Sequence, residues 1–132
     1  MASEITLTAK FVAKKGSAFA TSFPDVTTTS VDMAGDNCGN LTQTIGTTAE
    51  AIDMGDVNTG GNTLGWFIVW NRDPTNYVQI SYGDASGTNF VDKMIAKIPA
   101  GKYAGPLLAT SNVIYAKANT AACSVGWAAA QL

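Results

Sequence analysis

The sequence holds few residues that could perform catalysis at neutral pH. Histidine is absent, which removes the usual general base and the commonest transition-metal ligand. Glu4 and Glu50 are the only glutamates, so a pair of carboxylates for acid–base chemistry would have to include aspartates such as Asp53 and Asp56. Beside Gly55, such aspartates more often simply face solvent in a turn. We therefore expect no enzymatic activity and no catalytic residues.

A second group of oxygen-bearing side chains could bind calcium. Asn71, Asp73 and Asn76 lie within six positions of one another, and calcium takes carboxylate and amide oxygens as ligands. The alternative is a tight turn around Pro74, in which the same side chains bond to the neighbouring backbone. We favour the turn, and we expect neither a metal nor a cofactor.

The two cysteines, Cys38 and Cys123, are too few for a four-ligand zinc site. A cysteine nucleophile would lack its imidazole partner, because the chain has no histidine. In a reducing compartment both thiols stay free, and we expect them to act as small buried or half-buried fillers. A disulfide between them is the alternative.

Charge is sparse along the chain. The net charge is −2 and charged residues make up 14%, against about 25% in an ordinary soluble domain. The cations cluster only as Lys14 with Lys15 and, more widely spaced, Lys93 with Lys97, so no nucleic-acid partner is expected. No apolar run reaches the roughly eighteen residues of a membrane span, and no membrane partner is expected. The scarcity of charge indicates that part of the surface faces protein.

The pattern of residues predicts strands rather than helices. Residues 4–14 alternate between apolar and polar side chains, residues 16–24 break the pattern, and residues 26–33 resume as a threonine-rich strand. Further strands are predicted at residues 41–46, 49–54, 66–70, 77–82, 90–98, 113–117 and 123–129.

The apolar run at residues 66–70 predicts a central strand that is covered on both faces, or on one face and by a partner. Residues 71–76 form a turn, after which residues 77–82 return as the second strand of a hairpin. Eight or nine short strands without helical periodicity predict an all-β fold. We expect one domain over residues 1–132, an antiparallel, jelly-roll-like β-sandwich.

From Thr47 onward, the order of several short motifs resembles that of small virion proteins of tailed bacteriophages. The first motifs are Ala49-Glu50-Ala51-Ile52, Gly55-Asp56-Val57, Gly65-Trp66-Phe67 and Asn71-Arg72-Asp73-Pro74-Thr75-Asn76-Tyr77-Val78. The later ones are Phe90 opening a strand, Ile98-Pro99-Ala100-Gly101 and Ile114-Tyr115-Ala116-Lys117-Ala118. The resemblance implies a β-sandwich mounted on a virion, often as a capsid decoration or cement protein. The first 46 residues carry no such match.

These observations together favour a virion structural protein that is made in the host cytoplasm. We expect it to bind the major capsid protein or other virion proteins, to stabilise the head, and to form a homo-oligomer, either a dimer or a trimer. Interfaces of this kind centre on aromatic anchors. The residues expected at the contact surface are Phe11, Phe19, Phe23, Trp127 and Leu132.

The alternative function is a tail or fibre module that binds a host receptor or a glycan. It would use an exposed aromatic residue such as Tyr103 and the polar loop at residues 83–89. Flat aromatic rings stack on the C–H faces of sugars, but aromatic residues on strands more often fill the core. The aromatic residues that could form such a platform are Trp66, Trp70, Tyr77, Tyr82, Tyr103 and Trp127.

Overall fold

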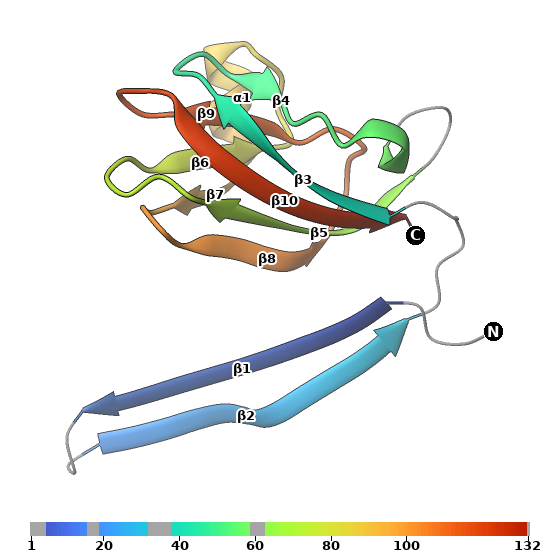
Figure 1. Ribbon diagram of the computed structural model, residues 1–132, viewed down its shortest axis with the longest axis vertical. Coiled ribbons are helices and arrows are strands. Elements are labelled where there is room, and N and C mark those ends of the chain that lie inside the picture. Colours follow the sequence, from blue (N-terminus) through green and yellow to red (C-terminus); the bar gives the residue numbers. More distant parts are fainter. Residues whose placement is uncertain (1–4, 16–18, 32–37, 59–62, 132) are drawn as a thin grey trace. The chain divides into compact units, whose positions relative to one another are not determined.

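The computed structural model describes residues 5–15, 19–31, 38–58 and 63–131 (Figure 1). They belong to two compact units, which we call the hairpin unit (Met1–Met33) and the sandwich unit (Ala34–Leu132). The expectation of one domain over residues 1–132 stays a prediction.

The hairpin unit contains two long antiparallel strands, β1 (Ile5–Lys15) and β2 (Phe19–Val31), which form a two-stranded sheet. The register runs from Ile5 opposite Val31 to Lys15 opposite Phe19. The predicted break at residues 16–24 is therefore too long, because β2 already begins at Phe19. Threonine and aromatic residues favour extended backbone, and Pro24 is tolerated because β2 is an edge strand.

The sandwich unit has two four-stranded antiparallel sheets. Sheet I contains, in spatial order, β3 (Cys38–Ile45), β10 (Cys123–Gln131), β5 (Leu64–Asn71) and β8 (Tyr103–Leu108). Sheet II contains β4 (Glu50–Ala51), β9 (Tyr115–Ala118), β6 (Val78–Ser81) and β7 (Met94–Ile98). Figure 1 shows the two sheets stacked face to face.

The pairing of these eight strands is nested. β3 pairs with β10, β4 with β9, β5 with β8, and β6 with β7, all antiparallel. Successive pairs alternate between the sheets, as if one long hairpin had been rolled up, and this is the jelly-roll arrangement. The predicted all-β, jelly-roll-like sandwich is confirmed.

Two local predictions are wrong. The strands predicted to form a hairpin, β5 and β6, lie in different sheets, and β6 pairs with β7 and β9 instead. The predicted strand at residues 90–98 begins as a helix, α1 (Gly87–Asp92), and only its second part is β7. The helix forms because the Phe90 N–H donates to the Ser86 carbonyl at 2.9 Å while the Phe90 side chain is buried.

The strand predicted at residues 49–54 is reduced to β4 and is followed by a 3-10 helix, η1 (Gly55–Val57). Gly55 has a φ of 56°, in the left-handed region where a glycine backbone is unstrained. The chain can therefore turn sharply there, which ends the extended segment. None of the helices in the described residues has the length and apolar character to cross a membrane.

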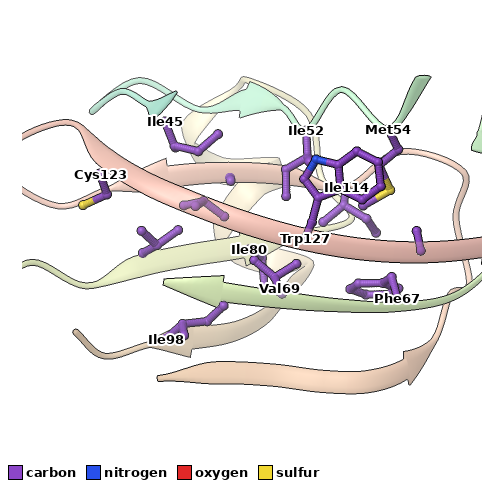
Figure 2. Close-up of a cluster of buried hydrophobic side chains, with 14 of the residues drawn as sticks. Ile45, Ile52, Met54, Phe67, Val69, Ile80, Ile98, Ile114, Cys123 and Trp127 are labelled. Carbon is purple, nitrogen blue, oxygen red and sulfur yellow. The ribbon is translucent and has the colours of Figure 1, made fainter. Parts of the chain in front are cut away.

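The core lies between the two sheets, where side chains from both meet (Figure 2). Alternate residues of each strand point inward, as the period of a strand requires. Sheet I contributes Phe67, Val69, Val125 and Trp127, and sheet II contributes Val78, Ile80, Ile98 and Ala116. Ile52, Met54 and Ile114, from the connections, complete this part of the core.

Candidate functional site

The outer face of sheet I is unusually apolar at its centre. On β5, Phe67 and Val69 point into the core, so Trp66, Ile68 and Trp70 point outward. Trp70 is 47% exposed, whereas Val69 is fully buried. The apolar run of β5 therefore fills the core with one set of side chains and forms an outer ridge with the other.

The neighbouring strand β10 presents only small residues on the same face. Its inward residues include Val125, Trp127 and Ala129, which leaves Gly126, Ala128 and Ala130 on the outside. The register places Gly126 opposite Trp70, Ala128 opposite Ile68 and Ala130 opposite Trp66. A ridge of large side chains thus runs beside a strip of very small ones.

The difference in side-chain size produces a groove of about 820 Å³. All four strands of sheet I and two connections contribute to its lining. The lining residues are Asn40, Leu41 and Thr42 of β3; Ile68 and Trp70 of β5; Tyr103 of β8; Gly126, Trp127 and Ala128 of β10; and Arg72 and Gly101 of the connections. Tyr103 is 67% exposed and lies directly opposite Trp70 in the register. Two exposed aromatic residues therefore stand side by side at one wall.

One charged residue, Arg72, is among the described residues that line the groove. The strands of sheet I contain no Asp, Glu, Lys or Arg. Arg72 follows β5 directly, and its guanidinium carbon lies 5.2 Å from the centre of the Trp70 ring, a cation–π arrangement. The backbone N–H of Arg72 donates to the Ser124 carbonyl at 2.9 Å, which fixes this position beside β10. No acidic residue is among the described residues that line the groove.

The aromatic residues of the predicted sugar platform differ in their exposure to solvent. Trp127 is buried, Trp66, Tyr77 and Tyr82 are half-buried, and Trp70 and Tyr103 are exposed. The loop at residues 83–89 does not line the groove. Sequence reasoning missed the grouping of Trp70 and Tyr103 with Arg72. The alternation of small residues at Gly126 and Ala128 was the available signal, but it needs the strand register to be interpreted.

The predicted contact residues fall in different places. Phe11 and Phe23 are register partners on β1 and β2, and Phe19 opens β2 opposite Lys15, while their side chains lie outside what the structure describes. Leu132 lies outside the described residues. Trp127 has its ring in the core and is only 5% exposed, so it can contribute little contact area.

Residues 71–76, where the sequence allowed either a calcium site or a tight turn, form a turn that is held by side-chain hydrogen bonds. Asp73 Oδ1 accepts the backbone N–H groups of Thr75 at 2.8 Å and of Asn76 at 2.6 Å. These bonds favour the ionised carboxylate and hold the pKa of Asp73 below its usual value. Asn71 Oδ1 accepts the backbone N–H of Asp73 at 3.0 Å. Asp73 Oδ1 and Asn71 Oδ1 therefore act as acceptors inside the turn.

The cysteines and the two aspartates considered for catalysis do not line the groove. Both cysteines are free; Cys123 is buried and its pKa is raised by desolvation, whereas Cys38 is exposed, so the predicted burial is wrong for Cys38. Cys38 is exposed because it opens the edge strand β3. Asp53 and Asp56 are exposed, and Asp53 Oδ1 accepts the Gly55 N–H at 3.0 Å. Within the described ranges, no group of three or more histidine, cysteine or acidic residues could hold a metal ion.

Comparison of the chain with protein-family models, with curated proteins and with solved structures finds no match.

Proposed function

We propose that this chain is a non-enzymatic structural protein of a tailed-phage virion, a cement or decoration protein that binds the major capsid protein and stabilises the head. The observation that carries the proposal is the hairpin unit. Among the described residues of this unit, its two strands, of 11 and 13 residues, form a sheet of only two strands. A two-stranded sheet is marginally stable in water unless a third strand or another surface packs against it.

A long hairpin of two strands could serve as an attachment arm. Each strand of a two-stranded sheet has one edge without a strand partner, and such an edge can pair with a strand of another protein. The motif order after Thr47 and the scarcity of charge support the view that the chain is one component of a virion's protein shell. Jelly rolls are common in viral capsids, which is support by analogy alone.

The mechanism we propose is binding without chemistry. The protein would bridge neighbouring capsid subunits, as a dimer or trimer, and would resist internal DNA pressure by burying roughly 1,200 Å² or more of surface. Phe11, Phe19 and Phe23 of the hairpin unit, together with Leu132, are the proposed contact residues.

The test compares the binding of charged variants to particles that lack the protein. Phe11→Asp and Phe23→Asp should abolish binding, because a carboxylate in an apolar contact is costly to desolvate. Thr6→Asp is the matched control, since Thr6 is an exposed residue of β1. An unchanged far-UV circular dichroism spectrum of the full chain would show that the variants keep the strands of the hairpin unit.

Heating the particles gives the functional measurement. Particles with the wild-type protein should release their DNA at a higher temperature than particles without it. Equal release temperatures would refute the cementing role, even if the protein binds.

The second candidate is a tail or fibre module that binds a host receptor or a glycan. The specific observation in its favour is that Trp70 and Tyr103, adjacent in the register, are both exposed beside the groove of sheet I. Failure of the protein to bind any member of a glycan array would count against this candidate.

A further inference from the structure

The floor of the groove includes one residue without a side chain, Gly126, which is itself buried. A Cβ atom at Gly126 would lie 3.6 Å from Cδ of Arg72, 3.7 Å from Cε3 of Trp70 and 3.9 Å from Cγ2 of Thr42. The backbone there is not in the left-handed region, so it does not require glycine. A side chain larger than that of alanine at this position would therefore press against Arg72, Trp70 and Thr42 at the floor of the groove.

The two walls of the groove differ in chemistry. Trp70 and Tyr103 offer flat, partly exposed rings on one side, and rings of this kind bind apolar faces. On the other side, Asn40 and Thr42 of β3 offer an amide and a hydroxyl, which can exchange hydrogen bonds with hydroxyl groups. A ligand with an apolar face and a hydroxylated edge fits between them.

The charge of the groove adds a further requirement. Arg72 is the only arginine of the sequence, and among the described residues that line the groove it is the only charged one. Its planar guanidinium can make two parallel hydrogen bonds to a carboxylate, and no described residue of the lining supplies one. The cation–π contact with Trp70 holds the Arg72 guanidinium beside the aromatic wall of the groove. A ligand carboxylate that pairs with Arg72 would therefore place the rest of the ligand next to the Trp70 ring.

We propose that this groove binds an acidic oligosaccharide, with sugar rings stacked on Trp70 and Tyr103, and a sugar carboxylate paired with Arg72. The volume of about 820 Å³ lies within the range of small-molecule sites, roughly 300–1,000 Å³. The proposal rests on the second candidate function and names its ligand class; it is independent of attachment to a capsid, since the residues of the groove all belong to the sandwich unit.

The experiment uses the full chain in solution and calorimetric titration with matched probes. The acidic probes are trigalacturonic acid and sialyllactose, and the neutral counterparts are carboxyl-reduced trigalacturonic acid and lactose. We expect at least one acidic probe to bind about 10-fold or more tightly than its neutral counterpart, since charged hydrogen bonds of this kind discriminate by roughly that factor. Equal binding of both counterparts would overturn the assignment of Arg72, and no binding of any probe would overturn the site.

Variants locate the binding. Trp70→Ala and Tyr103→Ala should each weaken binding of the acidic probe by about 10-fold or more. Arg72→Gln should remove the preference for the acidic probe while retaining the stacking. Gly126→Val should weaken binding of every probe by filling the floor. Val91→Ala is the control, because Val91 is 63% exposed on α1 and does not line the groove.

The oligomeric state of the same variants separates a sugar site from a protein interface. If the groove binds sugars, Trp70→Ala and the wild-type protein should elute with the same mass in light-scattering chromatography. Conversion of an oligomer into a monomer by Trp70→Ala would assign the groove to a second copy of the chain and overturn the proposal. Thermal unfolding of each variant confirms that it is folded before titration.

Discussion

The side-chain amide of Asn71, at the end of β5 in sheet I, donates a 3.0 Å hydrogen bond to the backbone carbonyl of Ile98, at the end of β7 in sheet II. The same amide donates to the Asn76 carbonyl at 2.8 Å, and its oxygen accepts the Asp73 N–H. Asn71 is fully buried. One polar side chain therefore joins the two sheets and the connection between β5 and β6.

Asn71→Leu should destabilise the sandwich unit by about 2–4 kcal/mol, because it leaves the Ile98 and Asn76 carbonyls and the Asp73 N–H without their partner. Urea unfolding followed by circular dichroism measures the change. Asn40→Leu is the control, since Asn40 is exposed on β3, and it should change stability by less than about 0.5 kcal/mol. A similar small effect of Asn71→Leu would show that the amide does not hold the sheets together.

The positions of most strands could be predicted from the sequence, but the placement of β5 and β6 in different sheets could not. Strand periodicity and turn residues are local signals, and residues 71–76 contain the turn chemistry expected of a hairpin. Whether such a segment returns in the same sheet or crosses to the other depends on long-range bonds, here that of Asn71 with Ile98. Nothing in the local pattern encodes that bond.

Gly83 and Gly87 should respond very differently to alanine. A Cβ on Gly83 would collide with the backbone of Asn89 and Phe90 in the middle of α1, whereas a Cβ on Gly87 meets nothing within 4 Å. We expect Gly83→Ala to destabilise the protein by about 2 kcal/mol or more, and Gly87→Ala to be neutral or to stabilise by up to about 1 kcal/mol. Thermal unfolding measures the stability of both variants. Equal changes in stability for Gly83→Ala and Gly87→Ala would contradict the close packing of Gly83 against α1.

The dependence of stability on acid should involve Asp73. Its folded-state pKa lies below the ordinary value of 3.8, chiefly because of the backbone N–H of Asn76 and then that of Thr75. A depressed pKa stabilises the fold above the unfolded value and loses that contribution as the pH falls through the folded pKa. Asp73→Asn should therefore flatten the decline in stability below about pH 4.

Urea midpoints between pH 7 and pH 2.5 measure that slope. Asp84→Asn provides an independent comparison, since the pKa of Asp84 is also lowered, first by the Ser86 side chain and then by the Ser86 backbone N–H. The two substitutions should flatten the curve additively. A curve for Asp73→Asn that parallels the wild type would contradict the role of the turn.

The candidate groove was less predictable than the fold. The residues of β5 are apolar on both faces, so alternation could not separate the inward Val69 from the outward Trp70. The groove also depends on Gly126 lying opposite Trp70 and on Tyr103 lying on the other side. These residues are far apart in the sequence, and only the nested pairing of the jelly roll brings them together.

The two thiols should differ in reactivity. Cys38 is exposed, whereas Cys123 is buried and desolvation raises the pKa of its thiol, so that less of the reactive thiolate is present. Iodoacetamide without reductant should label Cys38 in the native protein and Cys123 only after unfolding. Mass spectrometry of the native chain should show one label. A native chain without any label would contradict the free, exposed thiol of Cys38.

Trp127 should stabilise the core mainly through its ring rather than through its polar atom. The indole is 5% exposed, and within the described part of the chain its buried Nε1 has no hydrogen-bond partner. Trp127→Phe loses ring volume but also removes a buried donor that is costly to desolvate, so it should cost only about 1–2 kcal/mol. Trp127→Ala should cost about 3–5 kcal/mol, because it leaves a large cavity between the sheets. Urea unfolding measures both, and equal losses for Phe and Ala would indicate that the Nε1 group has a stabilising partner in the folded protein.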